Sequence, residues 1–199
     1  KIRAQARNLP SESNIRTRLL ALAREVRSGD PQNVEAQAAR SYWSAYFGDL
    51  FRRDPDGDGI NALLNYGYAI VRAAIARAVV AAGLLPALGI HHANRSNAFC
   101  LADDLIEPLR PLVDAQVHEL ADAGQTELNP SAKAHLLRLL TAEVVTAGQS
   151  GPLLVALHRL VASYVHCLQG EARRLEIPVA LPCVPDVSSP LDDVAPGPK

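Results

Sequence analysis

Residues 89–114 have the composition of a metal site, because they hold two imidazoles and four carboxylates in 26 residues. Asp104 and Glu107 are three residues apart, so a helix that begins near Asp104 places both carboxylates on one face. His91 or His92 could reach that face from the preceding loop, and their spacing does not distinguish them. Oxygen donors with an imidazole suit Mg²⁺ or Mn²⁺, whereas a closed structural zinc site more often uses thiolates.

A further carboxylate, Glu35, lies near the start of a helix predicted over residues 34–47. Pro31 suits the first position of this helix, which places Glu35 in the second turn. Glu35 shares a face with small residues and with Tyr42, at the edge of a buried stripe. Ionisation is costly there unless a cation or a hydrogen-bond donor accompanies the carboxylate. A bound metal would be such a cation.

These two segments and residues 60–72 between them resemble the CRISPR-associated spacer integrase, the universal DNA nuclease of the adaptation machinery. The type II members are the most similar. The resemblance is strong over residues 4–114 and weak over the helices that follow. Its signal is the order of the motifs: a Glu, then Asn-Tyr-Gly-Tyr at residues 65–68, then a His, then Asp-Leu-Ile-Glu at residues 104–107.

The resemblance implies roles for individual residues. It makes Glu35, His92 and Glu107 the ligands of a divalent metal, with Asp104 at a neighbouring acidic position that supports the site. It favours His92 over His91, because the family places its His fourth in a Gly-apolar-x-His run. The implied reaction is metal-assisted phosphoryl transfer, in which the 3′-hydroxyl of a captured DNA fragment attacks the boundary of a CRISPR repeat.

DNA contacts are expected from amide, phenol and guanidinium side chains around this site. The candidates are Asn61, Asn65, Tyr66, Arg72, Arg95 and Arg110. Arg95 stands three residues after His92, where a guanidinium can fork onto a phosphate. Two alternatives stay open, because Tyr66 could pack in the core and Arg110 could pair with Asp114 at helical spacing.

The resemblance also implies partners and a longer protein. The partners would be spacer-precursor and repeat DNA, a second copy in a homodimer, and the small ferredoxin-fold subunit of the adaptation complex, all in the cytoplasm. Family members carry an N-terminal β-rich domain, so this chain, which contains no Met, is expected to be a truncated helical catalytic lobe. One alternative is a non-catalytic scaffold remnant of the family. Another is a helical hydrolase of small phosphates, which would need a deep closed pocket.

Charge is uneven along the chain, although the net charge is only −1. Residues 1–53 carry ten Lys and Arg against five Asp and Glu, whereas residues 101–199 carry seven against thirteen. A basic first quarter beside an acidic metal site suits a phosphodiester enzyme, although a solvated helix surface gives the same counts. Three Cys without a C-x-x-C spacing fit a reducing cytosol.

The predicted fold is all-α, with a helical catalytic domain over residues 1–177 and a disordered Pro-rich tail over residues 178–199. Helices are predicted at 15–26, 34–47, 60–82, 101–123, 131–147 and 153–175. Pro108 and Pro111 predict a bend beside Glu107. The stretch 60–83 is about long enough to span a bilayer, but its two Asn and two Arg favour a buried helix and no membrane.

Overall fold

The computed structural model describes residues 1–27 and 29–181 of the chain. Its α-helices are α1 (Ile2–Arg7), α2 (Asn14–Glu25), α3 (Val34–Phe47), α4 (Ile60–Ala81), α5 (Cys100–Ile106), α6 (Arg110–Asp122), α7 (Pro130–Arg138) and α8 (Leu153–Leu168). Two 3-10 turns, η1 (Glu107–Leu109) and η2 (Leu139–Thr141), and three strands, β1 (Glu143–Thr146), β2 (Gln149–Pro152) and β3 (Val179–Ala180), complete the described part. The predicted helical class is confirmed, with a small sheet added to it.

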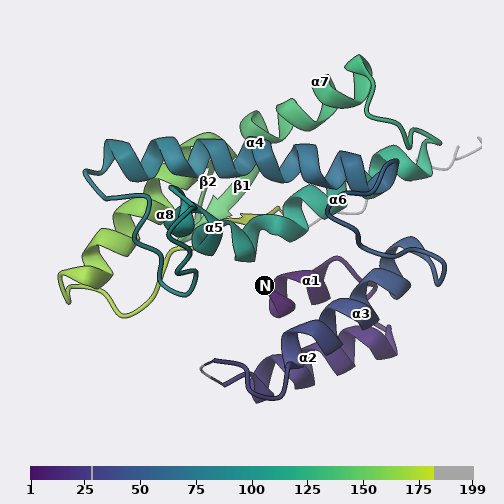
Figure 1. The fold of residues 1–199 in the computed structure, drawn as a ribbon, viewed down its shortest axis with the longest axis horizontal. Helices are drawn as coiled ribbons and strands as arrows, with labels where there is room; N and C mark the ends of the chain where they lie inside the picture. The colour runs from purple at the N-terminus through teal and green to yellow at the C-terminus, as the bar shows by residue number, and fades with distance from the viewer. Residues whose placement is uncertain (28, 182–199) are drawn as a thin grey trace, which may run out of the picture.

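The helices form two groups, which we call the N-terminal lobe (residues 1–47) and the main lobe (residues 60–181). Figure 1 shows α1, α2 and α3 packed together below the rest of the molecule. Each lobe has its own cluster of buried apolar side chains, centred on Leu19 and Tyr42 in one and on α4 in the other. Trp43 packs against both clusters and so links the two lobes.

Helix α4 is the centre of the main lobe, and α5, α6, α7 and α8 all pack against it. Gly67 permits the close crossing with α6, because a Cβ at this position would collide with the side chain of Val113. Among the described helices, α4 alone has the length and apolarity of a membrane span, and half of its most apolar 18-residue window is buried inside the protein. This burial is that of a core helix, as the sequence predicts.

The predicted bend beside Glu107 is confirmed, because helix α5 ends at Ile106 and α6 begins only after the turn η1. Pro108 lies at the start of η1, and Pro111 lies at the start of α6. A proline at the start of a helical segment breaks no hydrogen bond within it. The two prolines therefore divide the predicted helix 101–123 into pieces and turn the chain at Glu107.

The predicted helix 131–147 is wrong in its second half. Helix α7 ends at Arg138, and strands β1 and β2 then form a hairpin that turns at Ala147 and Gly148. Both turn residues have positive φ, +50° and +79°, as a tight two-residue hairpin turn requires. The N-cap of α7 is Asn129, whose side chain accepts a hydrogen bond from the backbone N–H of Ala132 at 2.9 Å.

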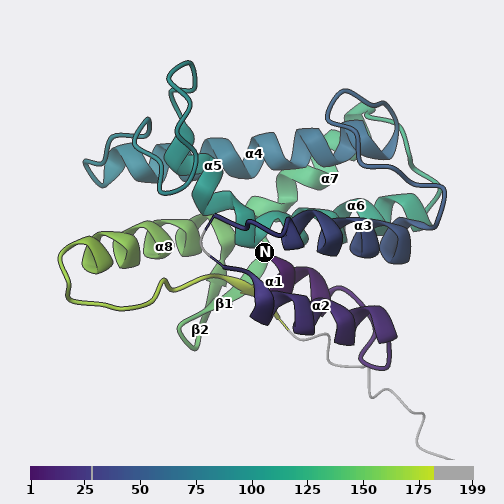
Figure 2. The same ribbon diagram turned by 60° about the horizontal axis from the view of Figure 1, so that its bottom comes forward.

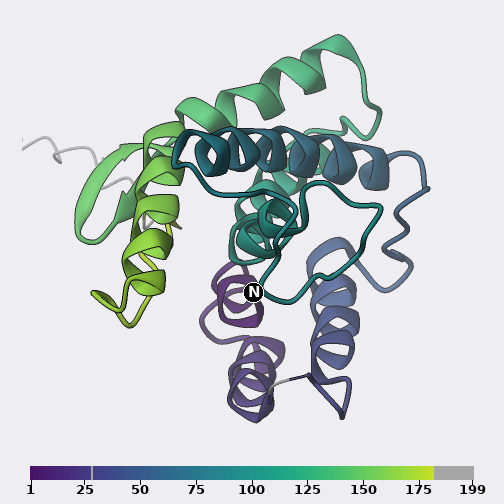
Figure 3. The same ribbon diagram turned by 60° about the vertical axis from the view of Figure 1, so that its left-hand side comes forward.

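Two other predicted boundaries differ from the structure. Helix α8 ends at Leu168 and not at 175, and β3, inside the predicted tail, pairs antiparallel with β1 to give the strand order β2-β1-β3. Figures 2 and 3 show this sheet beside α8. The short helix α1 has no counterpart among the predicted helices. The prediction of disorder over residues 182–199 falls outside the described residues.

Candidate metal site and DNA interface

The three predicted metal ligands line one open hollow of about 770 Å³ between the lobes. Glu35 comes from α3, His92 from the loop between α4 and α5, and Glu107 from η1. His91 and Asp104 line the same hollow. Within residues 1–27 and 29–181, no three His, Cys, Asp or Glu side chains are grouped closely enough to hold an ion. The structure thus places the predicted ligands on one surface without assembling a coordination sphere.

Asp104 fixes the loop that carries the two histidines. Its carboxylate accepts backbone N–H bonds from Ile90 at 2.5 Å, His91 at 2.9 Å and His92 at 3.2 Å. A fourth contact joins Asp104 Oδ1 to His92 Nδ1 at 2.6 Å. Burial raises the pKa of Asp104, but these donors outweigh it and the pKa lies below its usual range. Asp104 is therefore ionised at neutral pH.

The contact with Asp104 decides which nitrogen of His92 is available. An ionised carboxylate at Nδ1 favours the tautomer with the proton on that nitrogen, which leaves Nε2 with its lone pair. A carboxylate behind an imidazole is the usual arrangement for a metal-binding histidine. His91 lines the same hollow with its ring edge-on to that of His92, 5.7 Å between centroids. The geometry therefore favours His92 over His91, which the spacing left open.

Gly89 gives a physical reason for the glycine at the start of the Gly-apolar-x-His run. A Cβ at this position would collide with the backbone oxygen of His92 and would lie 2.9 Å from Oδ2 of Asp104 and from Cβ of Cys100. The loop can fold back onto Asp104 only because residue 89 has no side chain.

Substitution of Gly89 by alanine is expected to weaken Mn²⁺ binding about tenfold, because the added methyl separates the loop from Asp104 and His92 loses its orienting partner. Gly151→Ala is the matched control, since a Cβ there meets nothing within 4 Å. Calorimetric titration with Mn²⁺ measures both variants. Equal affinities in Gly89→Ala and Gly151→Ala would contradict this account of the loop.

Glu35 and Glu107 enter the hollow with different surroundings. Glu107 pairs with two cations, Lys1 Nζ and Arg110 Nε, each at 2.8 Å. Arg110 thus pairs with Glu107 and not with Asp114, the alternative left open by the sequence. Glu35 is exposed in the first turn of α3, not the second, because the helix begins at Val34. A divalent cation would have to share Glu107 with its two partners or displace them.

The start of α3 is capped by a residue that the sequence analysis did not single out. The carboxylate of Asp30 accepts backbone N–H bonds from Val34 and Glu35, each at 2.9 Å. The sequence predicts Pro31 at the first position of the helix, but the helix begins at Val34 and Pro31 precedes it. An anion at this end is also favoured by the helix dipole. Asp30 orients the first turn and so sets where Glu35 projects.

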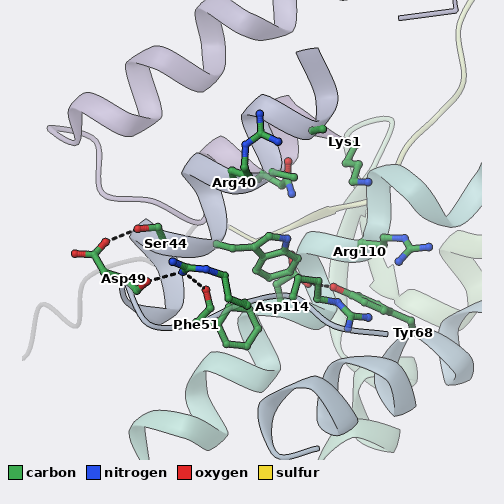
Figure 4. A pocket seen from close by; sticks show the side chains of 14 residues that line it. Lys1, Arg40, Ser44, Asp49, Phe51, Tyr68, Arg110 and Asp114 are labelled. Carbon is green, nitrogen blue, oxygen red and sulfur yellow. Dashed lines mark hydrogen bonds between the residues drawn. The ribbon is translucent and has the colours of Figure 1, made fainter. Parts of the chain in front are cut away.

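A second cavity, of about 720 Å³, adjoins the first and shares Lys1 with it. Figure 4 shows this cavity between α3, the following loop and α6. Its lining combines the aromatic rings of Trp43 and Phe51 with cations. The cations are Lys1, Arg40, Arg52, Arg53 and Arg110. Proteins that bind single-stranded nucleic acid combine cations, which pair with the phosphates, with aromatic rings, on which the bases stack.

Four of these cations, Lys1, Arg40, Arg52 and Arg53, were not among the sequence candidates. Their signal was the basic first quarter of the chain and the adjacent pair Arg52-Arg53. Two predicted DNA contacts, Asn61 and Asn65, bind Arg53 of this pair. Arg53 donates to Oδ1 of Asn61 at 3.0 Å and of Asn65 at 2.5 Å. Both amides also hold the backbone of the preceding turn, so they position Arg53 and are already occupied.

The other predicted DNA contacts lie in different surroundings. Arg72 pairs with Asp103 at 2.5 Å and lies over the ring of Phe99, which anchors the loop before α5. Arg95 is exposed on that loop, near the histidines. Tyr66 is half-buried against the main core, the alternative that the sequence left open. Two predicted DNA contacts therefore lie close to the predicted metal ligands. Arg110 pairs with Glu107, and Arg95 lies on the loop that carries His91 and His92.

Asp114 is a buried carboxylate that no candidate role explains. Its side chain is fully buried and accepts hydrogen bonds from the hydroxyls of Tyr42 at 3.0 Å and Tyr68 at 2.5 Å. Burial raises its pKa to about 7, although the two hydroxyls and the charges of Arg110 and Lys1 act in the opposite direction. Burial also raises the pKa of both tyrosines, so neither ionises near neutral pH.

This raised pKa gives stability a definite pH dependence. The folded pKa of Asp114 lies above the ordinary value of 3.8, so its contribution is fully present below that value and is lost as pH rises through about 7. Between pH 5.5 and 7 the loss is about 2 kcal/mol by linkage. We expect the melting temperature of the wild type to fall relative to Asp114→Asn over this range. A constant difference between the two would show that Asp114 does not titrate there.

Comparison with known proteins places this geometry among relatives. Residues 7–141 match the family model of CRISPR associated protein Cas1. A CRISPR-associated endonuclease Cas1 from Neisseria meningitidis serogroup C is 45% identical over 168 residues, which cover 83% of this chain and 55% of the relative. A CRISPR-associated endonuclease Cas1 from Pyrobaculum aerophilum is 36% identical over 152 residues, 74% of this chain and 52% of that protein. The chain thus spans about half the length of these curated relatives.

Two solved structures share the fold. A casposase bound to its integration product superposes with a TM-score of 0.68 at 22% identity, covering 88% of this chain and 61% of the casposase. A Cas1 protein from Thermotoga maritima superposes with a TM-score of 0.65 at 18% identity, covering 85% of this chain and 64% of that one. Identities this low show likeness of fold alone.

Proposed function

Because the chain belongs to the Cas1 family of CRISPR-associated proteins, we propose that it is the catalytic part of a divalent-metal-dependent DNA endonuclease and integrase. The proposed reaction inserts spacer DNA into a CRISPR array by phosphoryl transfer, as part of antiviral defence. The observation that carries the proposal is the position of the hollow lined by Glu35, His92 and Glu107 directly beside a basic, aromatic cavity. Relatives at 45% and 36% identity are named endonucleases, which agrees with it.

The donor set fits Mg²⁺ or Mn²⁺ in kind, since it combines two carboxylates with an imidazole whose Nε2 is available. Glu35, His92 and Glu107 would hold the ion. When bound, the ion would polarise a phosphodiester oxygen and the attacking hydroxyl. Asp104 keeps the proton on Nδ1 of His92, and Lys1 and Arg110 hold the carboxylate of Glu107 beside the hollow.

The basic cavity supplies the DNA contact in this proposal. Guanidinium groups such as those of Arg40 and Arg52 pair with phosphates, while bases stack on Trp43 or Phe51. Stacking tolerates any base, so this cavity would hold a strand without reading its sequence. Lys1 lines both cavities, and Arg110 lines the basic one and pairs with Glu107 of the hollow. A strand held here would have its next phosphate near the metal ligands.

The proposal includes the partners that family membership implies. These are spacer-precursor DNA, repeat DNA, a second copy of the chain and the small ferredoxin-fold adaptation subunit, in the cytoplasm. A hydrolase of small phosphates fits less well, because Glu35, His91 and His92 are exposed, whereas such an enzyme needs a closed pocket. A non-catalytic scaffold of the same family is the remaining alternative.

The test is cleavage of branched DNA, and joining of an oligonucleotide 3′-hydroxyl to repeat DNA, with Mn²⁺ and then with a chelator. We expect the wild type to cut or join DNA only with the ion, and Glu107→Ala to do neither while its circular dichroism spectrum stays helical. A wild type that binds DNA and Mn²⁺ without turnover would support the scaffold alternative instead.

A further inference from the structure

We infer that the hydrogen bond between Tyr42 and Asp114 is a positioning contact that holds Glu35 opposite Glu107 across the hollow. The inference rests on the proposed function, because it concerns the ligands of the proposed metal site. The inference assigns a role to Asp114, which lines the basic cavity and whose hydrogen bonds are made to Tyr42 and Tyr68.

The bond joins the two lobes, beside an ion pair of Lys1 with Glu107 and a hydrogen bond from Asn8 to the main chain of α6. Tyr42 belongs to the core of the N-terminal lobe, and Asp114 lies on α6 of the main lobe. The other links between α3 and α6 are ring contacts, in which Tyr46 and Phe47 lie 4.4 and 5.6 Å from the ring of His118. Apolar and ring contacts tolerate sliding, whereas a buried hydrogen bond loses most of its energy within a small displacement.

Each member of the bond is also held from its own side. Asn8 of the N-terminal lobe donates to the hydroxyl of Tyr42 at 3.0 Å and to the backbone oxygen of Pro111 at 2.8 Å. Tyr68 of the main lobe donates to the other carboxylate oxygen of Asp114 at 2.5 Å. Tyr42 is fully buried and Tyr68 is 7% exposed, so water does not replace these partners. Both ends of the bond are therefore fixed relative to their lobes.

The spacing connects this bond to the metal ligands. Glu35 lies seven residues before Tyr42, and Glu107 lies seven residues before Asp114. Within α3, seven residues are two helical turns, about 10 Å along the axis on the same face, whereas Glu107 lies in the turn η1 that precedes α6. Both carboxylates line the same hollow, so α3 and the η1–α6 segment leave the bond toward the same side. The bond thus sets the register in which the two carboxylates face each other.

The test compares Tyr42→Phe with Tyr68→Phe. Each variant removes one hydroxyl from the same carboxylate and keeps its ring, but only Tyr42→Phe breaks a bond between the lobes. We expect Tyr42→Phe to raise the dissociation constant for Mn²⁺, measured by calorimetry, about tenfold, as loss of a group that orients metal ligands does. Tyr68→Phe should change it by less than about twofold. Both variants should melt at similarly lowered temperatures.

A second measurement follows the lobes without any metal. Spin labels on cysteines at the exposed positions Arg18 of α2 and Arg159 of α8 report the distance between lobes by double electron–electron resonance. The background carries Cys167→Ser and Cys183→Ser, so that these two thiols are not labelled. Cys100 is kept, because it is buried. We expect the distance distribution to broaden in Tyr42→Phe and to match the wild type in Tyr68→Phe.

The outcomes separate this inference from the proposed function. If the wild type binds no Mn²⁺, the proposed metal site fails, and the distance distributions alone then decide whether the bond sets the register of the lobes. Equal distributions in the two variants overturn the inference. So does a Tyr42→Phe variant that binds Mn²⁺ as tightly as the wild type, even if its lobes move.

Discussion

Replacing His92 with alanine is expected to abolish divalent-metal-dependent cleavage of branched DNA, whereas replacing His91 should leave it nearly intact. Asp104 holds Nδ1 of His92 at 2.6 Å and so directs the free Nε2 as a ligand, while His91 donates only its backbone N–H to Asp104. We expect the rate to fall by at least about 100-fold in His92→Ala. His91→Ala should change it by about twofold, the effect of an ordinary surface substitution.

The two variants are matched because the histidines are adjacent on one exposed loop. Loss of one imidazole has the same effect on composition and charge in both, so a difference between them reports position alone. Rates with saturating Mn²⁺ and calorimetric affinities should be measured on both, with circular dichroism to verify the helices. Equal losses in the two variants would remove the distinction between His92 and His91.

The long helices were predictable from sequence because their apolar periodicity is sustained. The predicted range 34–47 agrees with α3, and the predicted range 60–82 ends one residue beyond α4. The bend beside Glu107 was predictable for a different reason, since proline acts locally and needs no knowledge of tertiary contacts. Over these segments, local chemistry and the final fold agree.

The hairpin was missed because short apolar runs do not distinguish strand from helix. Residues 131–147 include Val144, Val145 and Thr146, and such β-branched residues favour a strand. The predicted helix runs to residue 147, but Ala147 and Gly148 form the hairpin turn. Only the pairing of β1 with β2 and β3 stabilises these residues as strands, and pairing partners are not visible in a local pattern.

The candidate site depended on convergence, which periodicity does not reveal. Glu35 and Glu107 are 72 residues apart in the chain, and the family resemblance brought them together before the structure did. The resemblance said nothing of the basic cavity, because Arg40 and Arg53 belong to different segments that meet only after folding. Asn61 and Asn65 were expected at DNA, but their amides are used to hold the turn that carries Arg53.

Asp104→Ala is expected to lower Mn²⁺ affinity by about 10- to 100-fold, the range for loss of a group that orients a metal-binding imidazole. The carboxylate accepts hydrogen bonds from three backbone N–H groups and from the ring of His92. One substitution therefore removes both the contacts that hold the loop and the contact that keeps the proton on Nδ1 of His92. The helices should survive, because the buried apolar residues of α5 are unchanged.

Asp103→Asn is the matched control, because Asp103 is the adjacent carboxylate and accepts hydrogen bonds from Arg72 and Asn97, and none from His91 or His92. It should change Mn²⁺ affinity by no more than about twofold. The nuclear magnetic resonance of the His92 ring nitrogens gives a second readout without metal, since Asp104→Ala removes the carboxylate that holds the proton on Nδ1. If Asp104→Ala keeps wild-type affinity, His92 needs no orienting partner, and the reason for preferring it over His91 disappears.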